Sequence, residues 1–478
     1  MKRRDFIKLS LNTLLLLSLS GLVTKAEAGD ISIDNSVIVN IMLDGGPDFR
    51  HIIVPVYADD NDDETSYAAK FWKARSSIWG GTTDELKQAY KDNYVEIDSD
   101  IFDIDFAIHK DCAWLKDEIE AGNVAIISNV IASTNRDHHH SQVIMESGSL
   151  TANAHNLDVS GWAGRAATEL NAKVISCSSE IRLICNGPHP TDPLKHDNSC
   201  VIANYNSREP GLESYNTQGD LDAGEPDYKW NQKGKLDRAL TSYYALKRGT
   251  IPTSSPFSKA MAHEKQLRDF GNLLRARLES VTIPTSIDTI MNDDDKNIRL
   301  DSSSFAKQIL SLHDSYASQD ILNMRLASLS YSGWDSHKEL KKKITPKFED
   351  IFGTSKGLAS LVGELDDDAY KKSVFIVGGE FGRQLKSNGD IGNDHGRGNT
   401  MLVIGGKVNG GLYGELFPDS ELDKLNVKNE DIEGLTSMFK VYAEILNWQS
   451  DGLGDNVFED LASQDVESGV DLTTLMEA

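Results

Sequence analysis

The sequence predicts an α/β fold with a mostly parallel central sheet and helices on both of its faces. Three short apolar runs, at residues 37–43, 124–130 and 374–377, support this prediction. Each run is rich in Val and Ile and leads into glycine or polar turn residues, as strands buried on both faces tend to do. Helical stretches alternate with the runs, which favours a parallel sheet built with crossover helices.

The elements of the first half follow in order from the first strand. Residues 37–43 run into Asp44 and two glycines, which allow a tight turn at the strand's end. Residues 111–121 are predicted to form an amphipathic helix that stops at a glycine. Residues 124–130 form the second strand, and a short helix through Met145 follows it.

The second half predicts two further strands and several helices. The strand at residues 374–377 is followed by an apolar run at 401–404, and both have the glycine-flanked pattern of buried parallel strands. Periodicity predicts helices at residues 259–281, 304–329, 346–365 and 439–448.

We expect one α/β domain over residues 29–478, since no linker rich in Pro or Ser divides the chain. Residues 188–253 are rich in Asn, Asp, Gly, Pro and Tyr with weak periodicity, which predicts a variable insertion. The acidic residues 451–478 are expected to form a tail that packs loosely or is mobile.

Residues 1–28 have the pattern of an export signal. A basic start precedes the apolar run 11–23, and Ala26-Glu27-Ala28 resembles a cleavage site. The run is short for a membrane span, which needs about 20 residues. Arg3-Arg4 resembles the twin-arginine signal, although Lys2 stands where that signal usually has Ser or Thr. We therefore expect a periplasmic or extracellular protein, exported already folded; an ordinary secretory signal is the alternative.

The charge of the chain excludes some partners. The formal net charge is −25, and residues 1–28 hold five basic and two acidic residues, which leaves −28 for the rest. Such a chain is not expected to bind nucleic acid or an anionic membrane surface. No later apolar run is long enough to span a bilayer. The identity of any protein partner stays open.

The candidate site lies in the loops that leave the predicted strands. Glu380 and Arg383 follow the strand at 374–377, and Asp394-His395 precede the next strand. In open α/β sheets, ligands bind at the carboxyl ends of the strands. Groups suited to acid–base and metal-ligand chemistry are therefore concentrated where this fold class places its site.

A set of motifs resembles a known family over nearly the whole chain after the leader. The motifs are LDGGPDFRHIIVPV, NRDHHHSQVIMESG, SGWDSH, GGEFGR and NDHG followed by VIGG. Together they resemble the bacterial exported family called domain of unknown function 1501, which is similar in layout to the alkaline phosphatase and sulfatase superfamily. The resemblance implies an alkaline phosphatase-like fold. It also implies metal-ligand roles for Asp44, Asp335, His337 and His395, and a site role for His138.

Two positions depart from that layout. The strand at 374–377 leads into Glu380-Phe381-Gly382 where the superfamily has Asp-His-Gly, so a second metal position would lose its histidine. At the start of the helix that should offer a nucleophile, Asp137 stands where the family commonly has Ser. A covalent phospho-enzyme or sulfo-enzyme is therefore not expected.

Physical chemistry supports a cation at this site. Four carboxylates, those of Asp44, Asp335, Glu380 and Asp394, would repel one another unless a divalent cation bound them together with His337 and His395. Mixed oxygen and imidazole ligands suit zinc, manganese or magnesium, and calcium is a further candidate. Arg383 or Arg397 is predicted to bind an anionic substrate, because a planar guanidinium matches phosphate or sulfate oxygens.

Structural roles are open for the same residues. Glu380 and Arg383 are three apart and can pair with each other, Asp335 can cap a following helix, and Asp44 can shape the turn after its strand.

Three functions stay open from the sequence. The first is a metal-dependent hydrolase of phosphate or sulfate esters that uses a metal-activated water as nucleophile. The others are a non-catalytic periplasmic binding protein and a cell-surface assembly protein, both on a degenerate hydrolase fold. Whether the chain is an enzyme at all is left open.

Overall fold

The computed structural model describes residues 31–57, 64–152, 158–192, 195–204, 270, 273–274, 276–292, 300–458 and 470–477. The predicted export signal and most of the predicted insertion at 188–253 lie outside the described residues. So does most of the helix predicted at 259–281. The chain divides into two units, one of residues 1–30 and 208–282 and one of residues 31–207 and 283–478. Every element discussed below belongs to the second unit.

A nine-stranded sheet forms the centre of the described part of this unit, and the α/β prediction is confirmed. Its path runs β13-β5-β12-β11-β1-β10-β6-β9, and β14, off this path, pairs with the end of β5 at Val130 and Ile131. Its strands are β1 (Val37–Leu43), β5 (Val124–Ile131), β6 (Lys173–Ser176), β9 (Val201–Ala203), β10 (Met324–Tyr331), β11 (Ser373–Gly378), β12 (Asn399–Ile404), β13 (Gly411–Tyr413) and β14 (Thr436–Ser437).

The sheet is mostly parallel, but β12 is antiparallel to both of its neighbours, β11 and β5. The expectation that residues 401–404 run parallel to 374–377 is wrong. A parallel connection needs a crossover of a dozen or more residues, usually a helix. The segment between β11 and β12 contains no helix among the described elements, so the chain returns directly and reverses its direction.

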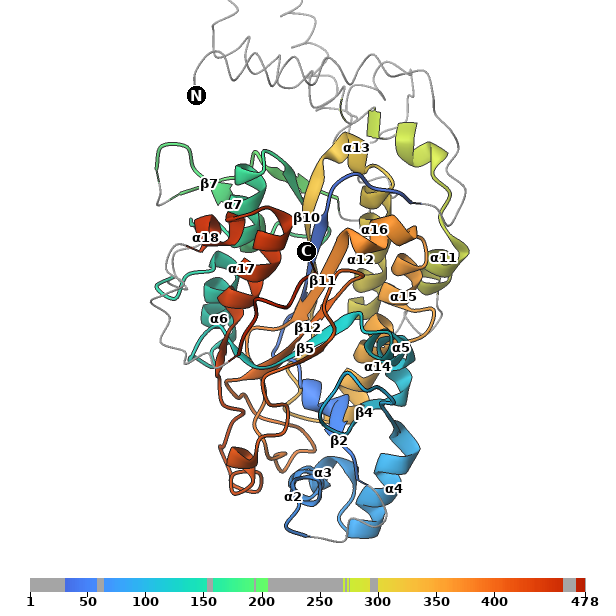
Figure 1. Cartoon of the computed structure of the whole chain (residues 1–478), viewed down its shortest axis with the longest axis vertical. Helices are drawn as coiled ribbons and strands as arrows, with labels where there is room; N and C mark the ends of the chain where they lie inside the picture. Colours follow the sequence, from blue (N-terminus) through green and yellow to red (C-terminus); the bar gives the residue numbers. More distant parts are fainter. Residues whose placement is uncertain are drawn as a thin grey trace, which may run out of the picture. The chain divides into compact units, whose positions relative to one another are not determined.

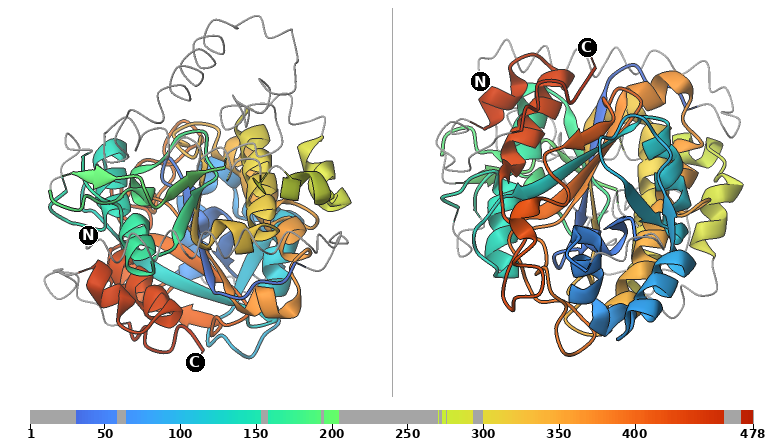
Figure 2. Two further views of the ribbon diagram at one scale, coloured as in Figure 1. Left: turned by 90° about the horizontal axis from the view of Figure 1, so that it is seen from above. Right: turned by 60° about the horizontal axis from the view of Figure 1, so that its bottom comes forward.

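Helices cover both faces of the sheet, as Figures 1 and 2 show. On one side lie α6 (His138–Ser147), α7 (Trp162–Glu169), α17 (Met438–Gln449) and α18 (Leu453–Val457). On the other lie α5 (Ala113–Glu120), α11 (Thr285–Met291), α12 (Leu300–Tyr316), α14 (Leu340–Phe352), α15 (Gly357–Val362) and α16 (Asp367–Lys371). The short α13 (Gln319–Leu322) joins α12 to β10, and β7 (Gly187–Pro188) pairs with β8 (His196–Asp197).

The helix predicted at 304–329 is the largest error of the sequence analysis. Its first half is α12, but its last part is β10, which pairs with β1 over six residues in the middle of the sheet. The strand reads MRLASLSY, which lacks the β-branched residues that mark a strand in sequence. The long helix predicted at 346–365 is two helices, α14 and α15, whereas the helix predicted at 439–448 is confirmed as α17.

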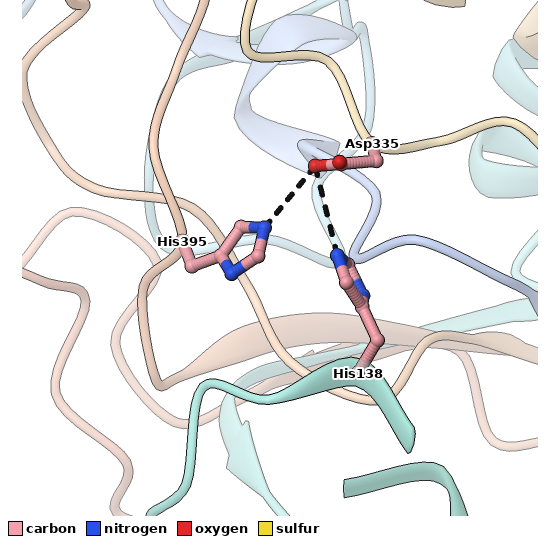
Figure 3. A group of neighbouring side chains, drawn as sticks. All are labelled: His138, Asp335 and His395. Carbon is pink, nitrogen blue, oxygen red and sulfur yellow. Dashed lines mark hydrogen bonds and ion pairs between the residues drawn. The ribbon is translucent and has the colours of Figure 1, made fainter. Parts of the chain in front are cut away.

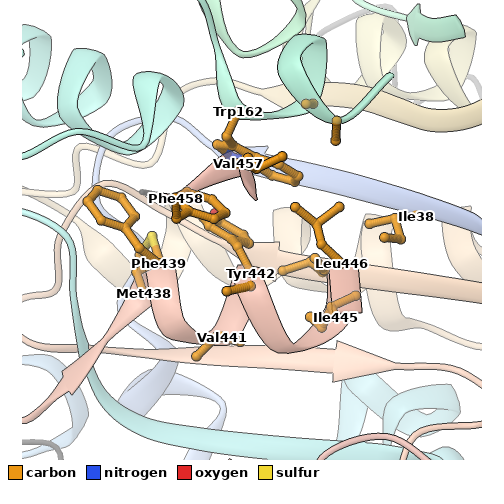
Figure 4. Packing of buried hydrophobic residues seen from close by; sticks show 14 of the residues in the cluster. Ile38, Trp162, Met438, Phe439, Val441, Tyr442, Ile445, Leu446, Val457 and Phe458 are labelled. Carbon is orange, nitrogen blue, oxygen red and sulfur yellow. The ribbon is translucent and has the colours of Figure 1, made fainter. Parts of the chain in front are cut away.

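The main core lies between the sheet and the side that carries α6, α7, α17 and α18 (Figure 4). On β1, Ile38 and Met42 belong to this core because alternate strand residues point to the same face. The rings of Trp162 and Tyr442 stack with centroids 4.5 Å apart, which joins α7 to α17. Ile144 and Met145 of α6, the helix that begins with His138, belong to the same core.

The acidic end of the chain is packed where the structure describes it. Helix α18 contacts α17, and Leu472 and Leu475 are buried. Val408 forms a β-bridge with Met476. The expectation of a loose or mobile tail therefore does not hold for residues 451–458 and 470–477.

A second, smaller sheet stands next to two buried histidines. It consists of β2 (Ile53–Pro55), β4 and β3, with β3 at Tyr94–Glu96 and β4 at Phe106–His109. Helices α2 (Tyr67–Ala74), α3 (Ser76–Trp79) and α4 (Thr83–Asn93) pack near it. The rings of His51 and His109 stack with centroids 5.9 Å apart, and both side chains are at most 2% exposed.

These histidines predict acid sensitivity of the fold. Burial lowers the pKa of His109 to about 4 and that of His51 well below its usual value, and nearby Lys341 adds to both shifts. In the unfolded chain both titrate near 6.5. Stability is therefore complete above pH 6.5 and is lost as the pH falls from about 6.5 to about 4, by up to about 3 kcal/mol from His109 alone. Denaturant unfolding at several pH values measures this slope.

His109→Gln should flatten the slope, whereas the matched change at the exposed His139 should leave it as in the wild type. Equal slopes in His51→Gln, His109→Gln and wild type would show that these two rings do not control acid stability.

Candidate functional site

The site loops meet at one rim of the sheet because of the strand directions. Strands β1, β5, β10 and β11 all run in the same direction, so their carboxyl ends lie at one rim of the sheet. Since β12 runs the opposite way, its amino end lies at the same rim. The loops that carry Asp44, His138, Asp335 and Glu380 therefore meet the loop that carries His395. The rim predicted from sequence is the one at which these side chains gather.

Three residues form a group whose potential ligand atoms all lie within 4.8 Å of one another: His138, Asp335 and His395 (Figure 3). Oδ1 of Asp335 lies 3.1 Å from Nε2 of His395 and 3.7 Å from Nε2 of His138. The three residues come from the start of α6, the loop after β10 and the loop before β12. Separate parts of the chain thus supply one carboxylate and two imidazoles to one point.

His337 adds a third imidazole next to this group. Its Nε2 lies 3.1 Å from Oδ1 of Asp335 and 2.9 Å from Nε2 of His395. Its Nδ1 lies 2.8 Å from Asp394, which places that carboxylate behind the imidazole, on the side away from Asp335. Asp394 therefore orients His337 and does not join the group itself.

The hydrogen bonds at Nδ1 determine what each imidazole presents at Nε2. Nδ1 of His138 is bonded to Glu380, that of His337 to Asp394, and that of His395 to the carbonyl of Arg136. All three partners are acceptors, so each neutral ring carries its proton on Nδ1 and a lone pair on Nε2. Three lone pairs then point toward the carboxylate of Asp335.

This arrangement fits a metal cation. Lone pairs on Nε2 of His337 and His395, 2.9 Å apart, repel each other unless a proton or a cation lies between them. Nε2 of His138 is buried and has no hydrogen-bond partner among the described residues. Metal–nitrogen bonds of about 2.0–2.1 Å place neighbouring ligand atoms roughly 3 to 3.5 Å apart, and the separations of 2.9, 3.1 and 3.7 Å given above lie close to that range.

Protonation states also favour cation binding. Burial and the neighbouring Arg383 lower the pKa of His395, so its ring is neutral near pH 7. Burial raises the pKa of Asp335, but the hydrogen bond and charge of Arg383, with contributions from His395 and His337, outweigh it and hold the pKa at about 2. The hydrogen bond to Glu380 raises the pKa of His138, so cation binding at Nε2 of this ring would compete with a proton.

Arg383 lies under the group and does not face a ligand. Its guanidinium is fully buried and donates to the carbonyls of Gly45, Gly46, Trp334 and Asn393 and, at 2.9 Å, to Oδ1 of Asp335. With its donors committed in this way, Arg383 positions the Asp335 carboxylate. The contact of Arg383 with an anionic substrate stays a prediction from the sequence.

Glu380 is a partner of His138, not of Arg383. Its carboxylate accepts a hydrogen bond from the Gly45 backbone N–H at 3.0 Å and lies 2.7 Å from Nδ1 of His138. The sequence left open an ion pair between Glu380 and Arg383. Glu380 is not among the partners that the described part of the chain provides to the Arg383 guanidinium. Glu380 fixes the His138 ring in position, as carboxylates behind metal-binding histidines commonly do.

Asp44 lies beside the group and pairs with a residue that the sequence analysis missed. Its Oδ2 accepts from Nη1 of Arg182 at 2.6 Å, and Arg182 also binds Glu146. Gln142 bridges Asp44 and Glu380 at 3.4 and 3.5 Å. Burial raises the pKa of Asp44 to about 6, although Arg182 opposes the shift. The structure thus separates Asp44 from the three-residue group.

A sequence signal for two of the missed residues exists on α6. His138, Gln142 and Glu146 follow one another at intervals of four, which places them along one side of the helix. Arg182 follows β6, a run of only four residues, and offers no comparable pattern.

Glycines allow the two loops of the site to touch. The segments 382–384 and 394–398 lie side by side, with a β-bridge between Arg383 and His395. A Cβ atom added at Gly382 would lie 1.9 Å from the carbonyl oxygen of Gly398, and one at Gly396 would lie 2.5 Å from the Arg383 backbone. The glycines of the GGEFGR and NDHGRG motifs thus let the loop that carries His395 approach the loop that carries Glu380.

Comparison with protein families gives a match to part of the chain. A family model described as "Protein of unknown function (DUF1501)" matches residues 302–430, the segment that contains β10, β11 and β12 and carries Asp335 and His395. Comparisons with curated proteins and with solved structures gave no match. None of the helices that the structure describes has both the length and the apolar character needed to cross a membrane.

Proposed function

We propose that this chain is an exported, metal-dependent hydrolase of phosphate or sulfate esters. One divalent cation would bind at His138, Asp335 and His395, with His337 as a further ligand. The observation that carries the proposal is that Nε2 of His138, His337 and His395 all lie within 3.7 Å of Oδ1 of Asp335. Two or three imidazoles with one carboxylate favour zinc or manganese over magnesium or calcium, which prefer oxygen ligands.

A bound cation would supply Lewis acidity, which lowers the pKa of a coordinated water and polarises a phosphoryl or sulfuryl oxygen. The chain's own residues would hold the cation and balance the charge of the substrate. Glu380 fixes Nδ1 of His138, so Nε2 of this ring would face the cation and the ring would not also act as a base. The coordinated water would lose a proton to solvent, the ester bond would break as the new bond to the water oxygen forms, and the leaving alkoxide would take up a proton from solvent.

Two arginines next to His395 support an anionic substrate. The side chains of Arg136 and Arg397 are 38% and 46% exposed, and both bind the buried carboxylate of Asp431. The carbonyl of Arg136 also accepts the hydrogen bond from His395. A shared carboxylate holds two partly exposed guanidinium groups close to the site, where they can bind phosphate or sulfate oxygens. This role belongs to Arg136 and Arg397 in the proposal, in place of Arg383.

The layout of the superfamily of alkaline phosphatases and sulfatases is part of the proposal. Asp44 after β1, Asp335 and His337 after β10, and His395 before β12 stand in the expected chain order. A likeness of layout supports a reaction class only by analogy. Export through the twin-arginine route to the periplasm or beyond remains an expectation from the sequence.

One observation favours the second candidate, a non-catalytic binding or assembly protein on the same fold. Asp137, at the position where the family commonly has Ser, accepts a hydrogen bond from the His140 N–H and so caps α6. The hydroxyls of Ser133 and Ser141 are bonded to the backbone of Asn135. None of these groups is placed as a free nucleophile, so a hydrolase here must depend on water.

We predict that the purified chain contains about one tightly bound divalent cation, since the described residues form one such group. Elemental analysis after cytoplasmic expression measures it. A panel of phosphate and sulfate esters should then show turnover that a chelator abolishes and added zinc or manganese restores. A metal-loaded protein that is silent across the panel would favour the binding protein, and a stable, correctly folded protein that takes up no metal would contradict the hydrolase.

A further inference from the structure

Three buried carboxylates lie together beside the candidate metal group. The side chains of Asp44, Glu146 and Glu380 are 17%, 6% and 0% exposed. Gln142 lies between Asp44 and Glu380, and Arg182 lies between Asp44 and Glu146. Buried carboxylates at such short separations repel one another strongly unless positive charge lies among them.

Each carboxylate has a separate partner. Glu380 is bonded to His138 and to the Gly45 N–H. Asp44 accepts from Nη1 of Arg182 at 2.6 Å, and Glu146 accepts from Nε at 2.8 Å and from Nη2 of the same guanidinium. The Ile184 N–H, at 3.2 Å, holds the other oxygen of Glu146. The planar guanidinium is thus bound along two of its edges by two acids.

We propose that the Arg182 guanidinium takes the place of a second divalent cation, so that the centre binds a single cation and Asp44 is not one of its ligands. This inference rests on the proposed cation site at His138, Asp335 and His395. An arginine is charged at every physiological pH and cannot dissociate from the chain. The positive charge beside the metal group would therefore be permanent, and independent of the cation supply.

The space around Arg182 is accessible to a small ion. A cavity of about 420 Å³ is lined by Gln142, Glu146 and Arg182, among other residues. If the guanidinium were removed, Asp44 and Glu146 would lose their shared counter-charge next to this cavity, which Glu146 lines. Oxygen ligands of this kind bind manganese or magnesium.

The test is the number of Mn²⁺ ions bound by the full chain, measured by calorimetric titration and elemental analysis. Wild type should bind one Mn²⁺, and Arg182→Met should bind two, since methionine fills space without charge. Arg182→Lys is the matched control and should still bind one, because its ammonium keeps the positive charge. Adding Asp44→Asn to Arg182→Met should return the number to one.

If Arg182→Met does not fold, Asp44→Asn alone tests whether Asp44 is a ligand of the cation, because asparagine keeps the shape of aspartate without its charge. It should retain one Mn²⁺ with an affinity within about threefold of wild type. Loss of the ion from Asp44→Asn, two ions in wild type, or one ion in folded Arg182→Met would overturn the inference and leave the cation site standing. Wild type that binds no ion would instead refute the proposed function.

Discussion

Asp335→Asn is expected to reduce cation affinity by more than about 100-fold, the upper range seen when only a group behind a ligand is lost. Asp335 is the anionic member of the group, and its Oδ1 lies within 3.1 Å of Nε2 of both His337 and His395. An amide keeps the shape but removes the negative charge that offsets the cation. His395→Ala should have a comparable effect. Elemental analysis of the purified variants and titration with zinc measure both.

Asp390→Asn is the matched control, since Asp390 lies in the same loop as His395 but is exposed and pairs with Lys338 at 3.6 Å. Its cation content should equal that of wild type. If all three variants retained the same content, the assignment of the centre to this rim would be wrong.

Arg383→Leu is expected to destabilise the folded chain by about 3 kcal/mol or more, because each buried acceptor left without a donor costs about 1–3 kcal/mol. The change leaves four backbone carbonyls without their donor. The lost ion pair with Asp335 adds little, since that side chain is 47% exposed and its charge is screened by solvent. Denaturant unfolding of the chelated protein measures it without any contribution from a bound cation.

Arg397→Leu provides the comparison, because the Arg397 side chain is 46% exposed and pairs with Asp431 at the surface side of the site. Its effect on the free energy of unfolding should stay near 1 kcal/mol or less. Equal losses in the two variants would show that Arg383 is no more important to the fold than an ordinary surface arginine.

The strands that could be predicted from sequence are those with dense Val and Ile. β1, β5 and β11 are such runs, and finding them was enough to place the loops of Asp44, His138 and Glu380 at one rim. Strand β10 was predicted as helix because its serines and alanine resemble the end of the preceding helix. The residues that follow it, Asp335 and His337, were found only through their motif.

The roles of the site residues depended on contacts that no local pattern contains. Arg383 has the spacing of a substrate-binding residue, but its direction is set by the turn at Gly45, more than 300 residues away in sequence. Arg182 pairs with Asp44 across 138 residues, so the separation of Asp44 from the metal group could not be seen in sequence. The sequence indicated which types of side chain lie at the rim. The tertiary structure determined which acidic side chain pairs with which basic one.

The reversed direction of β12 has a consequence for how the centre assembles. The single segment between β11 and β12 carries both Glu380 and His395, so one continuous stretch of chain supplies two residues of the centre. The glycines at 382, 396 and 398 bring its outgoing and returning limbs into contact. Glu380 and His395 are therefore positioned by contacts within one local segment, whereas His138 is added by α6 from a distant part of the chain.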